Sequence, residues 1–100
     1  MFIHHVFFWL KNPDNSSEKD QLAAGLNTLL SIQPHIAAHV GVPAGTSRGV
    51  IDTSYDFSLL LTFETAEDEQ AYQVHPIHDA FRENCEHLWS KVVVYDSVDV

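Results

Sequence analysis

Three predicted strands of this 100-residue chain carry apolar side chains on both of their faces. The runs are Phe-Phe-Trp-Leu at 7–10, three leucines at 59–61 and Val-Val-Val-Tyr at 92–95. Successive side chains of a strand point to opposite faces of its sheet, so a half-exposed strand alternates apolar with polar residues. Strands that are apolar at both positions predict a sheet that is covered on both faces.

The rest of the chain places these strands between helices. Strands are predicted over 2–11, 36–42, 55–63 and 91–98, a first helix from Ser16 or Ser17 to just before Pro34, and two more over 66–74 and 76–89. The last two helices form one connection, so the order is β-α-β-β-α-β. This order is typical of an α+β, ferredoxin-like domain, with an antiparallel four-stranded sheet and helices on one face. We expect a single domain over residues 1–100.

Helices on one face leave the other apolar face of such a sheet without a cover. Exposing it would create a hydrophobic patch far larger than monomers normally tolerate. The same face of a second copy would cover it, and we therefore expect a homodimer whose two sheets pack together. In the alternative, the loop over 43–54 folds back over the sheet, but this loop is rich in polar residues.

Charge and cysteine content narrow the class of protein. The formal net charge is −9 with only five Lys and Arg residues, which disfavours binding to nucleic acids and anionic membranes. The lone Cys85 excludes an internal disulfide and suits a reducing compartment. We find no signal peptide, no membrane span and no nucleotide-binding glycine motif, and we expect a soluble cytoplasmic protein without cofactors.

The segment Tyr72-Gln73-Val74-His75-Pro76-Ile77-His78 gathers a phenol and two imidazoles around a proline. A proline suits the first position of a helix and forces its predecessor out of the α region, so His75 is predicted to cap the last helix. His78 then lies in the first turn, where the unpaired N–H groups disfavour an imidazolium. We expect His78 to be neutral at pH 7 and able to accept a proton, although the structural alternative is that both histidines only fasten the helix break.

Other titratable residues receive plainer interpretations. A metal site built from His5, His75 and His78 is conceivable, but Pro76 interrupts the helix between the last two, and we expect no metal. The acidic run over 64–69 is interpreted as the solvated start of a helix, favoured by the helix dipole. Cys85 is expected to be a small buried hydrophobe.

Four segments together resemble the stress-responsive α/β-barrel family, also called the dimeric α/β-barrel or Dabb family. They are His-His-Val-Phe-Phe at 4–8, Tyr-Asp at 55–56, the Tyr-x-x-His-Pro-x-His element at 72–78 and Val-Val-Val-Tyr-Asp at 92–96. The resemblance runs over essentially the whole chain. It implies a homodimer whose two sheets form a barrel, with a pocket between the helices and the sheet.

Similarity to a polyketide cyclase of this family also implies site residues. The match places Tyr72 and His78 as catalytic residues and Asp96 as the carboxylate that orients His78. It places His5 as a pocket histidine, beside His75. In such a site His78 would take a proton and Tyr72 would polarise a carbonyl or stabilise an enolate.

The pocket lining departs from that cyclase. Phe57 stands where the cyclase has a histidine, and Ala23, Ala24 and Asn27 stand where it has aromatic residues. These positions are expected to line the pocket of this chain, but with a different volume and polarity. The same polyketide substrate is therefore not expected.

Three functions remain open at this point. The dimer could bind a small apolar or aromatic molecule, in a stress setting, without turnover. It could instead be a cofactor-independent cyclase, lyase or isomerase that uses Tyr72, His78 and Asp96 for enol chemistry. It could also be a dimerisation module without catalysis. A shared cavity for Tyr72 and His78, with Asp96 within hydrogen-bond reach of His78, is the arrangement that would favour the enzyme.

Overall fold

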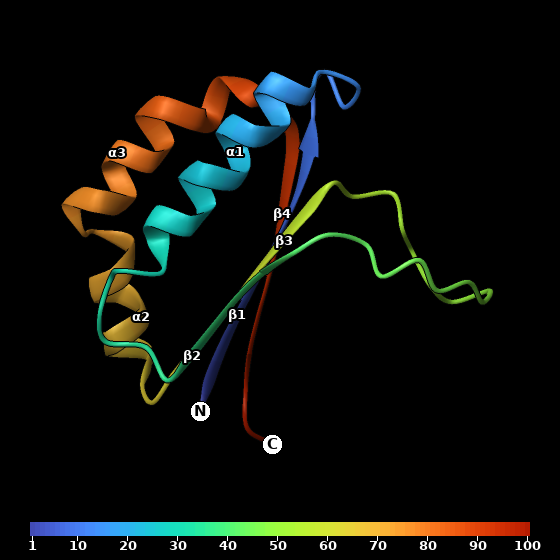
Figure 1. The fold of residues 1–100 in the computed structure, drawn as a ribbon. Coiled ribbons are helices and arrows are strands. Elements are labelled where there is room, and N and C mark those ends of the chain that lie inside the picture. Colours follow the sequence, from blue (N-terminus) through green and yellow to red (C-terminus); the bar gives the residue numbers. More distant parts are fainter.

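The computed structural model describes residues 1–100 and has the predicted ferredoxin-like architecture (Figure 1). Its elements, in chain order, are β1 (Phe2–Leu10), α1 (Ser16–Leu29), β2 (Ala37–Gly41), β3 (Phe57–Phe63), α2 (Ala66–Gln73), α3 (Pro76–Cys85), the 3₁₀ turn η1 (Glu86–Leu88) and β4 (Trp89–Val98). The sheet is antiparallel throughout, in the order β2-β3-β1-β4. The predicted fold class is confirmed.

The helices cover one face of the sheet and enclose the core there (Figure 1). Side chains at even positions of β1, including His4, Val6 and Phe8, point to this face and are buried. Leu61, Leu59 and Phe57 of β3 lie directly opposite them in the ladder. Leu22, Leu26 and Leu29 of α1 pack onto this layer and are buried with it. This leucine spacing is the helical periodicity that predicted α1.

No helix lies over the opposite face, which we call the open face. It carries the odd positions of β1 together with their cross-strand neighbours, and one row across it reads His39, Leu60, His5 and Tyr95. The loop over 42–56 extends away from the sheet, so it does not cover this face (Figure 1). Only the end of the loop is anchored there, where the Trp9 indole N–H donates to Ser54 Oγ at 3.1 Å.

Each helix begins at a residue whose side chain accepts a hydrogen bond from the backbone. Asn15 caps α1 by accepting from the N–H of Glu18 at 3.0 Å, so the cap lies one residue before the predicted serines. Thr65 caps α2 through the N–H of Asp68. As predicted, His75 caps α3, and its Nδ1 accepts from the N–H of Ile77 at 3.0 Å.

The end of the last helix differs from the expectation. The α-helix ends at Cys85, a 3₁₀ turn follows, and Trp89 already belongs to β4 rather than to the helix. Cys85 is buried in the core, as predicted. No helix of the chain combines the length and the apolar character needed to cross a membrane.

The cap of α3 gives a direct stability prediction. Replacing His75 by Ala removes the acceptor for the Ile77 N–H and should lower the free energy of unfolding by about 1 kcal/mol. His75→Asn, which restores a capping side chain, should recover most of the loss in urea unfolding experiments. The exposed His87 is the matched control, and an equal loss in His87→Ala would contradict the capping role.

Candidate functional site

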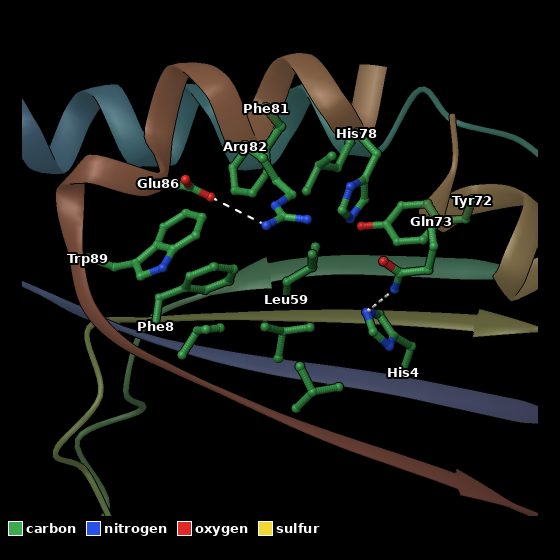
Figure 2. A pocket seen from close by; sticks show the side chains of 14 residues that line it. His4, Phe8, Leu59, Tyr72, Gln73, His78, Phe81, Arg82, Glu86 and Trp89 are labelled. Carbon is green, nitrogen blue, oxygen red and sulfur yellow. Dashed lines mark hydrogen bonds and ion pairs between the residues drawn. The ribbon is translucent and has the colours of Figure 1, made fainter. Parts of the chain in front are cut away.

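A cavity of about 280 Å³ lies between the helices and the sheet. It is lined by 14 residues, nine of them hydrophobic, which come from all three helices, from β1, β3 and β4, and from the 3₁₀ turn. Figure 2 shows Phe8, Leu59, Phe81 and Trp89 as its apolar walls. Tyr72, Gln73, His78 and His4 lie at one end of the cavity, while Arg82 and Glu86 lie on the side of Trp89 (Figure 2). An apolar cavity with a few convergent polar groups is the usual form of a small-molecule site.

Tyr72 and His78 face this cavity together. Their rings meet edge to face with centroids 5.0 Å apart, and the Tyr72 hydroxyl is directed toward the imidazole (Figure 2). The break at Pro76 produces this arrangement, since Tyr72 comes from the last turn of α2 and His78 from the first turn of α3. His78 Nδ1 is buried and has no hydrogen-bond partner. A buried polar atom without a partner is costly, and a bound ligand could satisfy it.

The environment shifts both groups toward their neutral forms. Burial lowers the pKa of His78, and the nearby Arg82 guanidinium lowers it further, while Asp79 opposes the shift. The direction agrees with the expectation from the helix start, although burial is the largest cause. Burial also raises the pKa of Tyr72, with the Glu69 carboxylate as a second cause. Near pH 7 the site therefore offers a phenol as donor and an imidazole as acceptor.

The expected hydrogen bond between Asp96 and His78 is not formed. Asp96 instead contacts His4, with 2.7 Å between Asp96 Oδ1 and His4 Nδ1. The reason is the sheet register, because His4 and Asp96 are directly opposite each other in the β1–β4 ladder. The Gln73 amide lies 3.3 Å from the other imidazole nitrogen, Nε2 (Figure 2). With this amide donating to Nε2, Nδ1 carries the hydrogen that is donated to Asp96.

Arg82 supplies the only cation among the cavity residues. It lies one helical turn after His78 and directs its guanidinium into the cavity (Figure 2). Its side chain is 63% exposed and makes a long contact of 3.5 Å to Glu86. A loose surface pair of this kind holds an arginine weakly, so the guanidinium is free to meet an anion.

Five residues expected at the pocket lie elsewhere. His5 is on the open face, because it has the opposite strand parity to His4. His75 caps α3, Phe57 is buried in the core, and Ala23 packs against that core. Asn27 is exposed and donates to the Ala23 carbonyl. None of these five lines the cavity, and neither does the sixth expected residue, Ala24, which is exposed on α1. This corrects the lining that the resemblance implied.

Three residues that line the cavity, His4, Gln73 and Arg82, were not predicted from the sequence to do so. For His4 a signal was present, since it shares strand parity with Val6 and Phe8, which belong to the helix-covered face. Gln73 stands inside the Tyr72–His78 element, and Arg82 follows His78 by four residues, a spacing that shares a helix face. Strand parity therefore carried the information for His4 and helix spacing for Arg82, while Gln73 had only its place beside Tyr72.

One group of residues could hold a metal ion, and it is not the one weighed from the sequence. Ligand atoms of His4, Glu69 and Asp96 all lie within 4.8 Å of one another. Glu69 is only 9% exposed, so the interpretation of the whole acidic run as a solvated face is wrong at this position. His5, His75 and His78 do not come together, because they lie on the open face, at a helix cap and in the cavity.

The comparisons with known proteins identify the family. The model of the stress responsive A/B barrel domain, Dabb, matches residues 2–99, and the chain belongs to this family. No curated protein matches the chain. The family model agrees with the resemblance of the Tyr-x-x-His-Pro-x-His element and its flanking strands.

Solved structures with the same fold include proteins from diverse sources. A Dabb family protein with a ferredoxin-like fold from Mesorhizobium loti is 23% identical, with a TM-score of 0.80 over 99% of this chain and 96% of that chain. A dimeric ferredoxin-like protein of unknown function from Thermobifida fusca is 21% identical, with a TM-score of 0.78 over 96% and 88%. The hydroxynitrile lyase from Passiflora edulis is 20% identical, with a TM-score of 0.77 over 99% and 93%. At these identities the likeness establishes the fold alone.

The lowered pKa of His78 predicts how stability depends on pH. Below the usual histidine value of 6.5, the unfolded chain binds a proton at this position more readily than the folded chain. The free energy of unfolding should therefore decrease as the pH falls from about 7 to about 5, and His78→Gln should reduce this decrease in urea titrations. His5, whose pKa burial also lowers, should retain its own part of the slope in that variant. His87→Gln is the control, and a slope that His78→Gln leaves unchanged would refute the assignment.

Proposed function

We propose that this chain acts as a homodimer, joined through the open face of its sheet, and that the cavity on the helix side binds a small molecule. The molecule would have an apolar body and a polar or anionic group. The observation that carries the proposal is the unpartnered, buried Nδ1 of His78 in a cavity with mostly apolar walls.

Support for the dimer comes from the composition of the open face. Phe7 and Leu60 are only half-buried there and Tyr95 is 64% exposed, although all three belong to apolar strand runs. A face of this kind is stabilised by packing against a second sheet. The structurally similar protein from Thermobifida fusca is described as dimeric, which favours the same assembly here.

Support for the ligand class comes from the placement of the polar groups. Tyr72 and His78 lie at one end of the cavity, and Arg82, its only arginine or lysine, follows His78 by one helical turn. Phe8, Phe81 and Trp89 form a cluster of aromatic rings along the wall. A ligand with a planar or aromatic body would pack against these rings. Its carbonyl oxygen would accept a hydrogen bond from Tyr72, and its anionic group would pair with Arg82.

Enol chemistry is the second candidate, and the pairing of a neutral base with a phenol favours it. His78 would take a proton from the carbon next to a carbonyl, forming an N–H bond as the C–H bond breaks. The electron pair would move to the carbonyl oxygen, and the Tyr72 hydroxyl would stabilise the enolate by donating a hydrogen bond. Return of the proton from His78 to another carbon gives an isomerisation. In a cyclisation, the enolate carbon would instead form a C–C bond with a second carbonyl carbon as its C=O π bond breaks, and the resulting alkoxide would take the proton from His78.

The mechanism differs from the one expected at the start in the role of Asp96. Since Asp96 contacts His4, it would position the His4 imidazole rather than orient the base. His4 would then hold Gln73 at the edge of the cavity through its Nε2 contact. Tyr72 and His78 remain the proposed catalytic residues, and Asp96 becomes a proposed positioning residue.

The setting of this activity is also part of the proposal. The name of the family supports a stress-linked role, and the single buried Cys85 supports a reducing compartment such as the cytoplasm. The proposed reaction needs no cofactor, because both groups it requires are side chains of the protein. His78 accepts the proton, and Tyr72 donates a hydrogen bond to the enolate oxygen. We propose that residues 1–100 act as one domain.

The dimer can be tested by sedimentation at micromolar concentration. The wild type should sediment with about twice the chain mass of 11.3 kDa. Tyr95→Glu places a charge on the open face and should give a folded monomer. Val74→Glu changes an equally exposed apolar residue of the helix side and should remain dimeric. A folded wild-type monomer would refute the interpretation of the open face.

Ligand binding and chemistry can be tested together by NMR with phenols, aromatic carboxylic acids and β-keto acids. Binding should shift the resonances of cavity residues, and His78→Ala should weaken it while the exposed His87→Ala does not. Arg82→Gln should weaken the acids relative to their amides by roughly five- to tenfold, on the order of 1 kcal/mol.

The same samples in D₂O distinguish binding from catalysis. If His78 is a base, the wild type should accelerate deuterium exchange at the carbon between the two carbonyl groups, and His78→Ala should abolish this acceleration. If the compounds bind but exchange at the same rate with the wild type and with His78→Ala, the ligand-binding proposal would stand and the catalytic proposal would be rejected. No binding by any compound class would favour the dimerisation module.

A further inference from the structure

Glu69 is a buried carboxylate on α2. The neighbouring acidic residue Glu67 on α2 is exposed, whereas Glu69 is more than nine-tenths buried. Its Oε2 has no hydrogen-bond partner. Burial of a carboxylate oxygen costs several kcal/mol unless a counter-charge, a hydrogen bond or a metal compensates it. The orphaned oxygen therefore indicates a missing partner.

The side chains around Glu69 identify the kind of partner. His4 of β1 is 3% exposed, and Asp96 stands opposite it on β4, so both project to the helix side of the sheet, where α2 lies. The three ligand atoms lie within 4.8 Å of one another, although no Glu69 oxygen is close enough to His4 for an ion pair. Neither carboxylate is paired with a lysine, an arginine or the N-terminal amine, because Arg82 contacts Glu86 and the N-terminal amine contacts Asp99. His4 is the only basic group beside Asp96, and Glu69 forms no ion pair.

We propose that His4, Glu69 and Asp96 bind a divalent first-row transition-metal ion. One imidazole and two carboxylates suit Zn²⁺, Co²⁺, Mn²⁺ or Fe²⁺, whereas Mg²⁺ and Ca²⁺ favour oxygen ligands alone. Metal–ligand distances of about 2.0–2.2 Å place neighbouring ligand atoms of a tetrahedral site roughly 3.4 Å apart. The present spacing brackets that value, with His4 and Asp96 closer at 2.7 Å and the widest separation below 4.8 Å.

The surroundings of the three residues suit such a site. Asp96 is 44% exposed on an edge strand, so an ion can enter from solvent without opening the core. Gln73 already contacts His4 Nε2, which leaves Nδ1 facing Asp96. With its amide rotated, Gln73 would accept from the Nε2–H of a metal-bound His4, the usual outer contact of a histidine ligand. Water would complete the coordination.

The bound ion would join three elements that are distant in the sequence. It would fasten the edge strand β4 to β1 and to α2, at the wall of the cavity that His4 lines. The site shares His4 and Asp96 with the positioning contact proposed above, but it excludes Tyr72, His78 and Arg82. Metal binding can therefore be measured without a ligand and without turnover.

The test is a titration of the untagged, chelator-treated chain with Co²⁺, followed by competition with Zn²⁺. The wild type should bind one Co²⁺ per chain with visible d–d absorption and should unfold at a higher temperature when loaded. Glu69→Gln should weaken binding by at least about tenfold. Glu67→Gln, on the exposed face of the same helix, should bind like the wild type.

A second pair of variants keeps the proposal testable if the buried substitution Glu69→Gln prevents folding. Asp96→Asn changes a half-exposed ligand and should also weaken Co²⁺ binding, while Asp99→Asn, just beyond the strand, should not. Absence of a d–d spectrum at millimolar Co²⁺ would overturn the proposal. Equal binding by the Glu69 and Glu67 variants, or by the Asp96 and Asp99 variants, would overturn it as well, because the ion would then be held by surface histidines.

Discussion

The hydrogen-bonded position of β1 between β3 and β4 is the constraint on which the rest of this molecule depends. It makes the N-terminal strand central in the sheet, so every side chain of β1 points either to the helix-covered core or to the open face. His4, Val6 and Phe8 take the first, and their neighbours take the second. The cavity, the contact with Asp96 and the apolar open face all follow from this one pairing.

The pairing also explains why the site is assembled from distant segments. β4 can reach β1 only after the chain has passed through α2, the proline break and α3, and this path carries Tyr72 and His78 over the strand that holds His4. The break at Pro76 therefore determines more than the start of α3. It orients two consecutive helices so that a phenol from one meets an imidazole from the other.

The fold was predictable because its signals are local and mutually consistent. The leucine spacing of α1, the turn residues after β1 and the His-Pro helix start each determine their own segment without tertiary information. Errors of one to four residues occurred at the start of α1 and at the ends of α1 and α3. Asn15 caps α1 in place of the predicted serines, α1 ends at Leu29 before the predicted stop at Pro34, and a 3₁₀ turn replaces the last turn of α3.

The site was predictable only in part, and the reason is register. Tyr72 and His78 are held together by a local break, so the sequence brings them to one cavity. The resemblance assigned Asp96 to His78, whereas the β1–β4 ladder places it opposite His4. The resemblance also assigned the pocket to His5, and a difference of one residue in a strand exchanges its two faces. The burial of Glu69 could not be predicted from its acidic neighbours, because only the packed position of α2 distinguishes its faces.

The adjacency of His4 and His5 has a consequence for how such a chain can vary. One residue inserted or deleted in β1 would send every following side chain of the strand to the wrong layer, exchanging groups of the cavity with groups of the open face. Length changes within this strand would therefore damage the interior and the outer surface at once. The loop over 42–56 is anchored to β1 only at its end, by Ser54 and Asp56, so the part that extends away from the sheet can grow or shrink without moving either layer. Changes of length in related chains should accordingly collect in that loop, and the first ten residues should change by substitution only.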